Sequence, residues 1–266
     1  MNMTETSYNP STGDQKRILE EIVMAAARLP DTAVKDIVRG KHLLAVTSAH
    51  TGLCTRMGCH GEHIQDEAHH VPESARELAS FLVAPPPNFP DAVSYAMAAI
   101  NSLLPVPERT IPFKAQDLIR KHGEKKNVVL IGHFSFVEKM GPEFRNLWVL
   151  EIRPRPGDLP AEAAADLIPR ADVVALTATT LLNGTCAYIL NLIPKDVFTI
   201  MLGPSTPFAP CMFDWGIDVL AGSCVVDARL TASSIRENLP FKRVRGIHPL
   251  IWTAENNSIR YNYITI

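Results

Sequence analysis

The stretch NVVLIGHFSFVEKMGPEFRNLWVLEIRPRPGDLP, residues 127–160, decides the fold class of this chain of 266 residues. Its two apolar runs, NVVLIG at 127–132 and LWVLEI at 147–152, are continuous, as in strands that are buried on both faces of a parallel sheet. Further runs of this kind follow at 172–178, 198–203 and 219–227. Because a helix can fill each gap, the pattern predicts a Rossmann-like α/β sheet whose strand ends share one edge, where such folds bind ligands.

The helices of this half are predicted in more detail. One helix is expected after Ser135, and another over 180–193. The second has apolar side chains on one face, namely Leu182, Cys186, Ile189, Leu190 and Ile193. Ser234 and Glu237 have the spacing of a capping box, which predicts that the last helix begins at Ser234.

The first half of the chain shows other periods. Helical spacing of apolar residues predicts a helix between Asp14 and Pro30. Short β-rich segments at 33–39, 42–48 and 51–56 predict a small antiparallel sheet. Two helices follow, the first over 73–83, and Asp91 can cap the second.

This order of elements is typical of an α+β domain rather than of a parallel sheet. Prolines cluster between Pro105 and Lys114, and they favour a domain boundary there. We therefore expect a small α+β domain over 1–110 and a Rossmann-like α/β domain over 111–266.

Composition excludes several classes of function. The net charge is -2, so the chain lacks the basic field that a nucleic-acid partner requires. Neither an apolar run long enough to span a membrane nor an N-terminal secretion signal occurs, which predicts a cytoplasmic protein with no membrane partner. Five cysteines, an odd number set mostly in apolar segments, favour reduced thiols over disulfides.

The loop after the first strand of the Rossmann-like half holds the candidate ligand residues Gly132, His133 and Phe134. A dinucleotide fingerprint would place three glycines there, and only Gly132 is present. Glu151 ends the second strand 19 residues later, near the spacing at which an acidic residue meets a ribose hydroxyl. The alternative is that Glu151 only ends a strand.

Two further loops carry polar candidates. Asp158 lies in the irregular segment EIRPRPGDLP with Glu151, but it could instead cap a helix that starts at Pro160. The third strand runs into hydroxyl and amide groups at a predicted helix N-terminus, where an anion or a polar ligand is favoured. These residues are Thr177, Thr179, Thr180 and Asn183, and the alternative is that one threonine merely caps the helix.

The fourth strand ends in Gly203-Pro204-Ser205-Thr206-Pro207. The prolines fix the backbone and Gly203 allows close approach, so Ser205 and Thr206 would be rigid hydroxyl groups at the sheet edge. This loop is the strongest local signal for a ligand site, although it names no reaction. Neither a Gly-x-Ser-x-Gly elbow nor a P-loop occurs, so the catalytic residues stay unknown.

A run of soft ligands suggests a metal site in the first half. Cysteines and histidines gather between positions 54 and 70, namely Cys54, Cys59, His60, His63, His69 and His70. Such ligands suit zinc or copper. However, no Cys-x-x-Cys pair occurs, and a polar loop that happens to contain histidines is the alternative.

Four segments resemble the DUF364 family, which is labelled as heavy-metal chelation proteins. They are EIRPRPGDLP at 151–160, VVALTATTLLNGT at 173–185, MLGPSTPFAP at 201–210 and DWGIDVLAGSCVVD at 214–227. In the first half, GLCTR at 52–56 and AINSLLP at 99–105 resemble the companion DUF4213 domain.

The resemblance implies an N-terminal domain like that of enolase, a Rossmann-like C-terminal domain, and a ligand site in the cleft between them. The motif positions that would line this cleft are Asn101, Gly132, Phe134, Glu151, Thr177, Thr179, Asn183, Gly203, Ser205 and Thr206. Most of the Cys/His run lies outside these motifs.

Three hypotheses remain open at this point. The first is a protein that handles a divalent transition metal or its small-molecule chelate, with His133 and Glu151 among the polar groups of the cleft. The second is an enzyme or binding module for a nucleotide-like or pterin-like molecule. The third is that the loops only stiffen an interface, for example that of a homodimer.

Overall fold

A helix and a small antiparallel sheet open the computed structural model, which describes residues 12–57 and 71–254. Helix α1 spans Thr12–Ala27, which confirms the helix predicted between Asp14 and Pro30, and it buries Ile18, Ile22 and Ala26. The sheet has the order β1-β2-β3, and its antiparallel strands are β1 (Asp36–Arg39), β2 (Leu43–Thr47) and β3 (Thr51–Thr55). The prediction of a small antiparallel sheet is confirmed.

Helices α2 (Ala75–Ser80) and α3 (Ala92–Leu103) pack beside this sheet, and α3 lies against β2 and β3. The Oγ of Ser74 caps α2 by accepting from the N–H of Glu77. Asp91 precedes α3 as predicted, but its carboxylate does not cap the helix. It accepts a hydrogen bond from Nε of Arg56 at 2.5 Å, because the guanidinium at the end of β3 is buried and requires a negative partner.

The second half contains, within the described residues, a seven-stranded sheet of order β10-β9-β8-β7-β4-β5-β6. Its strands are β4 (Asn127–Ile131), β5 (Asn146–Glu151), β6 (Leu159–Pro160), β7 (Val173–Thr177), β8 (Phe198–Leu202), β9 (Val219–Val225) and β10 (Ile247–Thr253). All pairs are parallel except β9 with β10. If the six parallel strands are numbered in chain order from β4, their order across the sheet from β6 to β9 is 3-2-1-4-5-6, which is the Rossmann order. The strand order therefore reverses between the neighbours β4 and β7.

The sequence missed the two edge strands for different reasons. Strand β6 is only two residues long and contains Pro160. Strand β10 contains His248 and Pro249, and it joins the sheet antiparallel to β9 at its outer edge. Polar residues and proline are tolerated at such an edge, so the continuous apolar signature of a central strand is absent.

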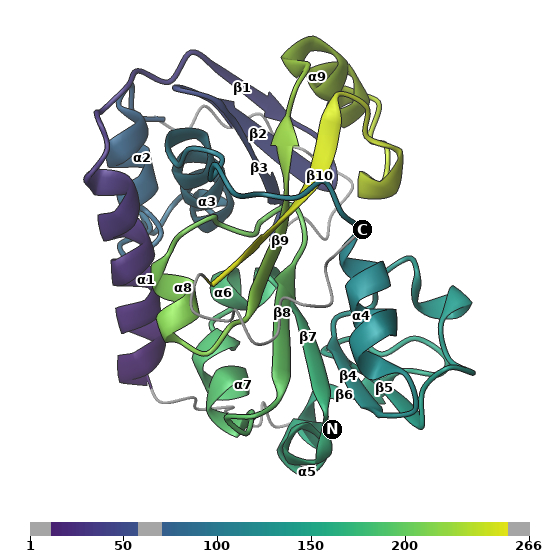
Figure 1. Ribbon diagram of the computed structural model, residues 1–266. Coiled ribbons are helices and arrows are strands. Elements are labelled where there is room, and N and C mark those ends of the chain that lie inside the picture. Colours follow the sequence, from purple (N-terminus) through teal and green to yellow (C-terminus); the bar gives the residue numbers. More distant parts are fainter. Residues whose placement is uncertain (1–11, 58–70, 255–266) are drawn as a thin grey trace, which may run out of the picture.

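Helices cover both faces of this sheet (Figure 1). Helix α4 (Ala115–Gly123) packs on one face, over residues such as Val128 and Val173. The other face carries the short helices α5 (Ala164–Leu167), α6 (Thr179–Leu182), α7 (Cys186–Leu192) and α8 (Cys211–Asp214). Within the described residues, four 3-10 turns lie between the longer elements, namely η1 (Val137–Lys139), η2 (Ala161–Ala163), η3 (Ile168–Arg170) and η4 (Phe241–Arg243).

The predicted helix over 180–193 is wrong, since α6 ends at Leu182 and α7 begins at Cys186. Gly184 between them has a φ of +80°, which a helix cannot contain. The helix expected after Ser135 is also wrong, because only the 3-10 turn η1 follows β4 before β5.

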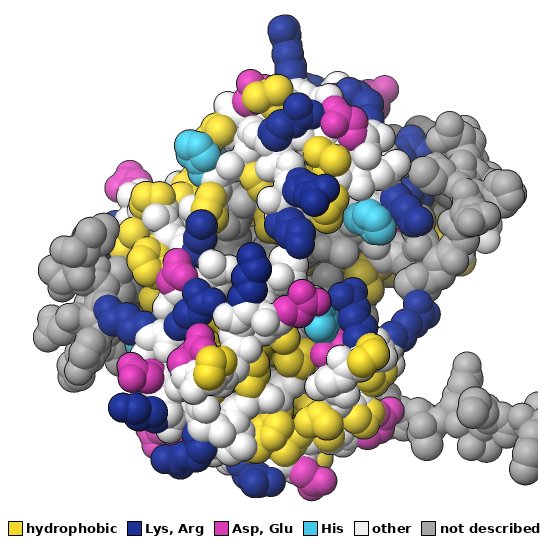
Figure 2. Space-filling model, turned by 90° about the vertical axis from the view of Figure 1, so that its right-hand side faces the viewer, with side chains coloured by type: hydrophobic (Ala, Val, Ile, Leu, Met, Phe, Trp, Pro, Cys, Tyr) yellow, Lys and Arg dark blue, Asp and Glu magenta, His cyan; other side chains and the backbone are white. Residues whose placement is uncertain are grey.

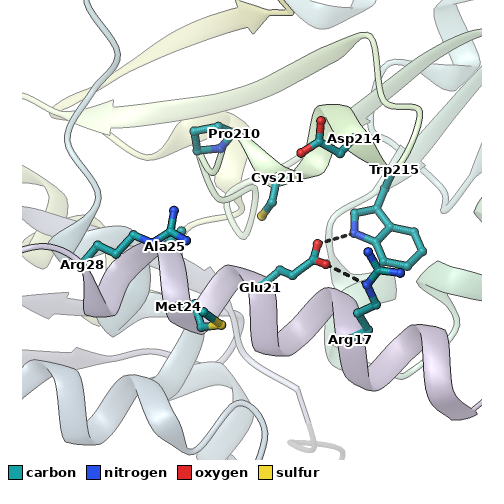
Figure 3. A pocket seen from close by; sticks show the side chains of 9 residues that line it. All are labelled: Arg17, Glu21, Met24, Ala25, Arg28, Pro210, Cys211, Asp214 and Trp215. Carbon is teal, nitrogen blue, oxygen red and sulfur yellow. Dashed lines mark hydrogen bonds and ion pairs between the residues drawn. The ribbon is translucent and has the colours of Figure 1, made fainter.

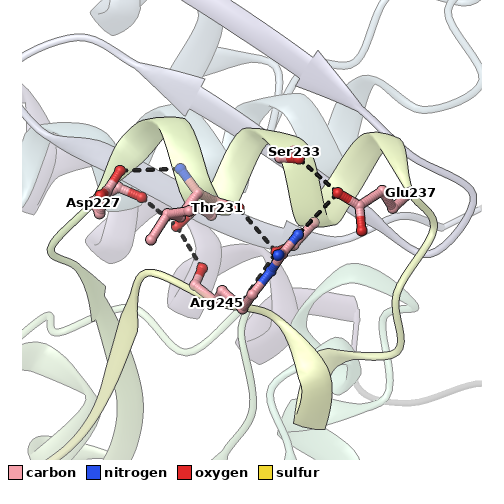
Figure 4. Close-up of polar contacts among 7 residues, drawn as sticks. Asp227, Thr231, Ser233, Glu237 and Arg245 are labelled. Carbon is pink, nitrogen blue, oxygen red and sulfur yellow. Dashed lines mark hydrogen bonds and ion pairs between the residues drawn. The ribbon is translucent and has the colours of Figure 1, made fainter.

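The start of the last helix was predicted wrongly as well. Helix α9 spans Ala228–Arg236, and Asp227 caps it by accepting from the N–H of Leu230. Ser234 lies in its last turn and donates to the carbonyl of Leu230. Glu237 accepts from the Ser233 hydroxyl and from Arg245, so it ties the end of α9 to the chain that leads into β10 (Figure 4).

The two halves interlock. Helix α1 packs against α7 and α8 of the second half, and α9 packs against β1 and β2 of the first. The contact of α9 is close, because a Cβ added to Gly40 would lie 2.4 Å from the carbonyl oxygen of Ile235. One hydrophobic cluster joins Leu44 and Ile100 to Val129 and Leu176. Because the two halves share this cluster, it stays a prediction that 1–110 and 111–266 form two separate domains.

The surface and the helices give two further observations. On the face shown in Figure 2, Lys and Arg side chains are spread among acidic and apolar ones. None of the helices in residues 12–57 and 71–254 has the length and apolar character needed to cross a membrane.

Candidate functional site

A cavity of about 390 Å³ opens at the carboxyl ends of β4, β5 and β7. This is the point at which the strand order reverses, where ligands bind in open α/β sheets. Its lining contains Gly132 and the polar residues Glu151, Glu162, Thr177, Thr179, Thr180, Asn183 and Thr185. Its apolar lining comprises Ile131, Leu150, Ile152, Ala161, Ala164 and Ile189. We call this the switch-point cavity.

Gly132 and Gly203 shape the backbone around the cavity. Gly132 has a φ of +106°, and a Cβ there would lie 3.0 Å from Cγ2 of Thr177. Gly203 has a φ of +122° and lies on the other side of the same threonine. L side chains rarely adopt such φ values, so glycine is required where β4 and β8 end beside Thr177.

Glu151 projects from the end of β5, and its carboxylate is oriented by the backbone. Oε1 accepts a hydrogen bond from the N–H of His133 at 2.7 Å, and Oε2 accepts one from the N–H of Ile152 at 3.2 Å. A carboxylate can accept about four hydrogen bonds, so each oxygen keeps a lone pair for a ligand. Glu151 is thus a positioned acceptor of hydrogen bonds at the cavity wall.

His133 and Asp158 form a buried pair beside this carboxylate. Nδ1 of His133 lies 2.8 Å from Oδ1 of Asp158 and carries the proton, because a carboxylate only accepts. Burial alone would raise the pKa of Asp158, but hydrogen bonds from the N–H of Arg155 and from His133 hold it below its usual value. Asp158 does not cap a helix at Pro160, since β6 follows it.

Threonine hydroxyls and an amide form the opposite wall. Oγ1 of Thr177 and Oγ1 of Thr179 lie 3.0 Å apart, and Thr180 donates to the carbonyl of Thr177. In the break between α6 and α7, Oδ1 of Asn183 accepts from both the N–H and the hydroxyl of Thr185. The wall is a set of hydroxyl groups with ordered orientations.

The first half of the chain supports this wall through Gln15 of α1. The buried amide of Gln15 donates to the carbonyl of Leu181 at 3.2 Å and accepts from the N–H of Ala187 at 3.0 Å. These groups belong to the last turn of α6 and the first turn of α7. Gln15 therefore satisfies backbone groups that the helix break leaves unpaired.

Other predicted ligand residues lie outside the switch-point cavity. Ser205 is fully buried, and its Oγ accepts from the N–H of Thr55 at 2.9 Å. Thr206 donates to the carbonyl of Ala221, and the amide of Asn101 donates to the carbonyl of Leu53. These side chains hold strands together in the structure.

Phe134 takes a different position from these hydrogen-bonded residues. Its ring stacks on Phe136 with the ring centroids 5.2 Å apart. The two rings thus fill the turn after β4 with apolar groups.

The described residues offer no clustered metal ligands, since groups of three or more His, Cys, Asp or Glu that could hold an ion are absent from 12–57 and 71–254. Cys54 is fully buried in β3, and burial raises the pKa of its thiol to about 12. The other members of the predicted run are Cys59, His60, His63, His69 and His70, and they lie outside the described residues.

Sequence reasoning missed Ile152, Glu162 and Thr185 as cavity residues. Ile152 directly follows Glu151, and the residue is 63% exposed. Thr185 could have been found, because the pair Asn183-Gly184 is a turn signal inside the supposed helix. Glu162 had no signal in the sequence, since only the fold brings η2 to the cavity.

A second hollow of about 630 Å³ lies between α1 and α8 (Figure 3). Its charged groups are partly paired, since Glu21 accepts from Nε1 of Trp215 at 2.7 Å and from Nε of Arg17 at 2.9 Å. Burial and the nearby carboxylates of Glu21 and Asp214 raise the pKa of Cys211 to about 11. The thiol in this hollow is therefore not an activated nucleophile.

The strand order defines an α/β protein of the Rossmann-like class, with a cavity at the switch point of its sheet. A family model described as "Putative heavy-metal chelation", DUF364, matches residues 114–248, which is half of the chain. The chain therefore belongs to the DUF364 family. The companion DUF4213 domain and its likeness to enolase stay predictions.

Solved structures support the fold. A DUF364 protein of unknown function from Desulfitobacterium hafniense DCB-2 has a TM-score of 0.76 at 20% identity, over 91% of this chain and 99% of its own. Another from Pyrococcus horikoshii, also of unknown function, has a TM-score of 0.71 at 15% identity, over 90% and 99%. No curated protein matches the sequence.

Proposed function

We propose that the chain binds a small organic molecule with neighbouring hydroxyl groups in the switch-point cavity. The observation that carries this proposal is the carboxylate of Glu151, which two backbone N–H groups orient at the cavity wall. Glu151 ends the second strand of the Rossmann order, where an acidic residue binds ribose hydroxyls in related folds. Two hydroxyls of one ligand can donate to its two oxygens.

Further features of the cavity support the same reading. Apolar side chains line one part of it and hydroxyl groups the other, as is typical of sites for small organic molecules. Its threonines can either donate or accept, so they suit a ligand with several polar substituents. The first half contributes through Gln15, which keeps the α6–α7 break in shape.

The experiment is a thermal-shift and calorimetry panel of adenosine, guanosine, ribose and neopterin with the wild type and Glu151→Gln. A ligand of the folded state raises Tm by mass action. Loss of a hydrogen bond to a charged group should weaken binding by about ten- to a hundredfold in Glu151→Gln. Asp166→Asn, on α5 but outside the cavity lining, is the control that should bind as the wild type does.

Two results would overturn the proposal. One is that none of these compounds shifts Tm and mass spectrometry of the denatured protein releases no co-purified molecule. The other is a ligand whose affinity is the same for the wild type and Glu151→Gln.

The family description favours a second candidate, in which the cavity holds a heavy metal bound to an organic chelator. The polar side chains of its described lining are carboxylates, hydroxyls and one amide. Their oxygen atoms suit hard cations better than soft ones. The metal would therefore arrive with ligands of its own, and Glu151 would bind the hydroxyl or amino groups of the chelator.

Calorimetry with Ni²⁺, Zn²⁺ and Cu²⁺, each alone and as its citrate or histidine complex, tests this candidate. Binding of a complex but not of the free ion, with loss in Glu151→Gln, would support it. Binding weaker than millimolar in every case would rule it out.

A further inference from the structure

We infer that the ligand of the switch-point cavity is a nucleoside without phosphate groups, an inference that rests on the proposed function. The ribose would donate to Glu151, and the base would cover Ile152. Four features of the site lead to this class: the turn after β4, the charges of the lining, the volume of the cavity, and the exposed apolar rim.

The turn after β4 lacks the groups that bind phosphate in dinucleotide-binding folds. There, a glycine-rich turn leads into a helix whose N-terminus holds the pyrophosphate. Here a single glycine, Gly132, is followed by the 3-10 turn η1 of three residues. The stacked rings of Phe134 and Phe136 occupy this turn, so apolar groups stand in the region of the missing helix N-terminus.

The charges of the lining disfavour an anion. Among the described residues that line the cavity, the ionisable side chains are those of Glu151 and Glu162, and both are acidic. Arg153 and Arg155 follow Glu151 in the same loop, but neither lines the cavity. Inside the cavity a phosphate dianion would face two carboxylates and no cationic side chain among the described lining residues. A neutral or cationic molecule has no such cost.

The size and the rim of the cavity fit a base and a sugar. A volume of about 390 Å³ lies near the lower end of the range for ligand sites, which favours a nucleoside over a dinucleotide. Ile152 is 63% exposed, directly follows Glu151, and lines the cavity together with Ala161 and Ala164, so it forms an exposed apolar rim. A planar base placed on this apolar rim would remove Ile152 from water while the sugar stays within reach of the carboxylate.

Calorimetry of the wild type with adenosine, guanosine, cytidine and uridine tests the inference, each beside its 5′-monophosphate and its 2′-deoxy form. We expect one nucleoside to bind, and its monophosphate and deoxy form each to bind at least about tenfold more weakly. Glu162→Gln should reduce the discrimination against the monophosphate, because it removes one of the two carboxylates that repel a phosphate. Ile152→Ala should weaken binding of the nucleoside. Its matched control is Val226→Ala, because Val226 is also an exposed apolar residue and lies outside the cavity lining.

The outcomes separate the two proposals. Monophosphates that bind as tightly as nucleosides would overturn the nucleoside class and leave the cavity as a binding site. Binding of ribose or neopterin alone, lost in Glu151→Gln, would do the same. If no compound in either panel binds and no molecule co-purifies, both proposals fail.

Discussion

Two regions of this protein have polar residues at strand ends, and they use them in opposite ways. In the first, which we call the β3 joint (Cys54, Thr55, Arg56, Asp91 and Ser205), the polar groups bond to one another inside the protein. In the switch-point cavity, Glu151 and the threonines are oriented by neighbours but still face a cavity. A polar loop at a strand end is therefore a candidate site only where its groups keep bonding capacity toward open space.

This comparison predicts the largest loss of stability at the buried ion pair of the β3 joint. Asp91→Ala would leave Arg56, whose side chain is 8% exposed, without this carboxylate. Removing one partner of a buried ion pair costs about 3–5 kcal/mol of the free energy of unfolding. Urea denaturation of the wild type and of Asp91→Ala measures this difference in the free energy of unfolding.

The double variant Arg56→Met with Asp91→Leu separates the charge effect from a loss of packing. Because it removes both charges, it should be clearly more stable than Asp91→Ala. If the free energy of unfolding of Asp91→Ala lay within about 1 kcal/mol of the wild-type value, as for a surface substitution, the pair would not be buried in solution.

The second expected effect concerns Ser205. Ser205→Ala removes the acceptor for the N–H of Thr55, and leaving this partly buried donor without a partner should cost about 1 kcal/mol, the lower end of the range for buried groups. Thr179→Val is the matched change in the cavity, and its effect should stay within about 0.5 kcal/mol. Thermal and urea unfolding compare the two. Equal losses would mean that both loops serve stability alike and would erase the contrast between the regions.

The smallest effect depends on pH and concerns the pair of Asp158 and His133 beside Glu151. The pKa of Asp158 is lowered in the folded state, despite burial, by the N–H of Arg155 and by His133. Its ionised form therefore stabilises the fold above the unfolded pKa of about 3.9, and this contribution is lost as the pH falls through the lower folded pKa.

Comparison with Asp158→Asn tests this point. The wild type should be the more stable protein between about pH 5 and 7, and the difference should shrink below about pH 4. The effect is modest because an amide oxygen still accepts one of the hydrogen bonds. A difference that grows as the pH falls would contradict the assigned direction of the pKa.

Local patterns predicted the central strands well, because each is buried on both faces and its run of apolar residues is unbroken. Capping and helix continuity were harder to read. Asp91 has the position of a cap, but the buried Arg56 takes its carboxylate. The helix predicted over 180–193 is interrupted at Gly184, and the amide of Gln15, far away in the sequence, satisfies the backbone groups of that break.

The loop at 203–207 shows why sequence alone could not separate a site from a structural contact. Its rigid hydroxyls were the strongest local signal, yet Ser205 bonds to Thr55 because the first half of the chain covers this end of the sheet. Glu162 gave no signal at all, and η2 brings it to the cavity.

The sequence by itself determined the strand runs, the α/β class, and that Gly132, Glu151 and the threonines after β7 would lie at one sheet edge. These properties follow from apolar periodicity and from the direction of parallel strands, which are local or topological facts. Only the tertiary structure decided which of the polar groups form hydrogen bonds between distant segments and which face a cavity. That outcome depends on desolvation by residues that are far apart in the chain.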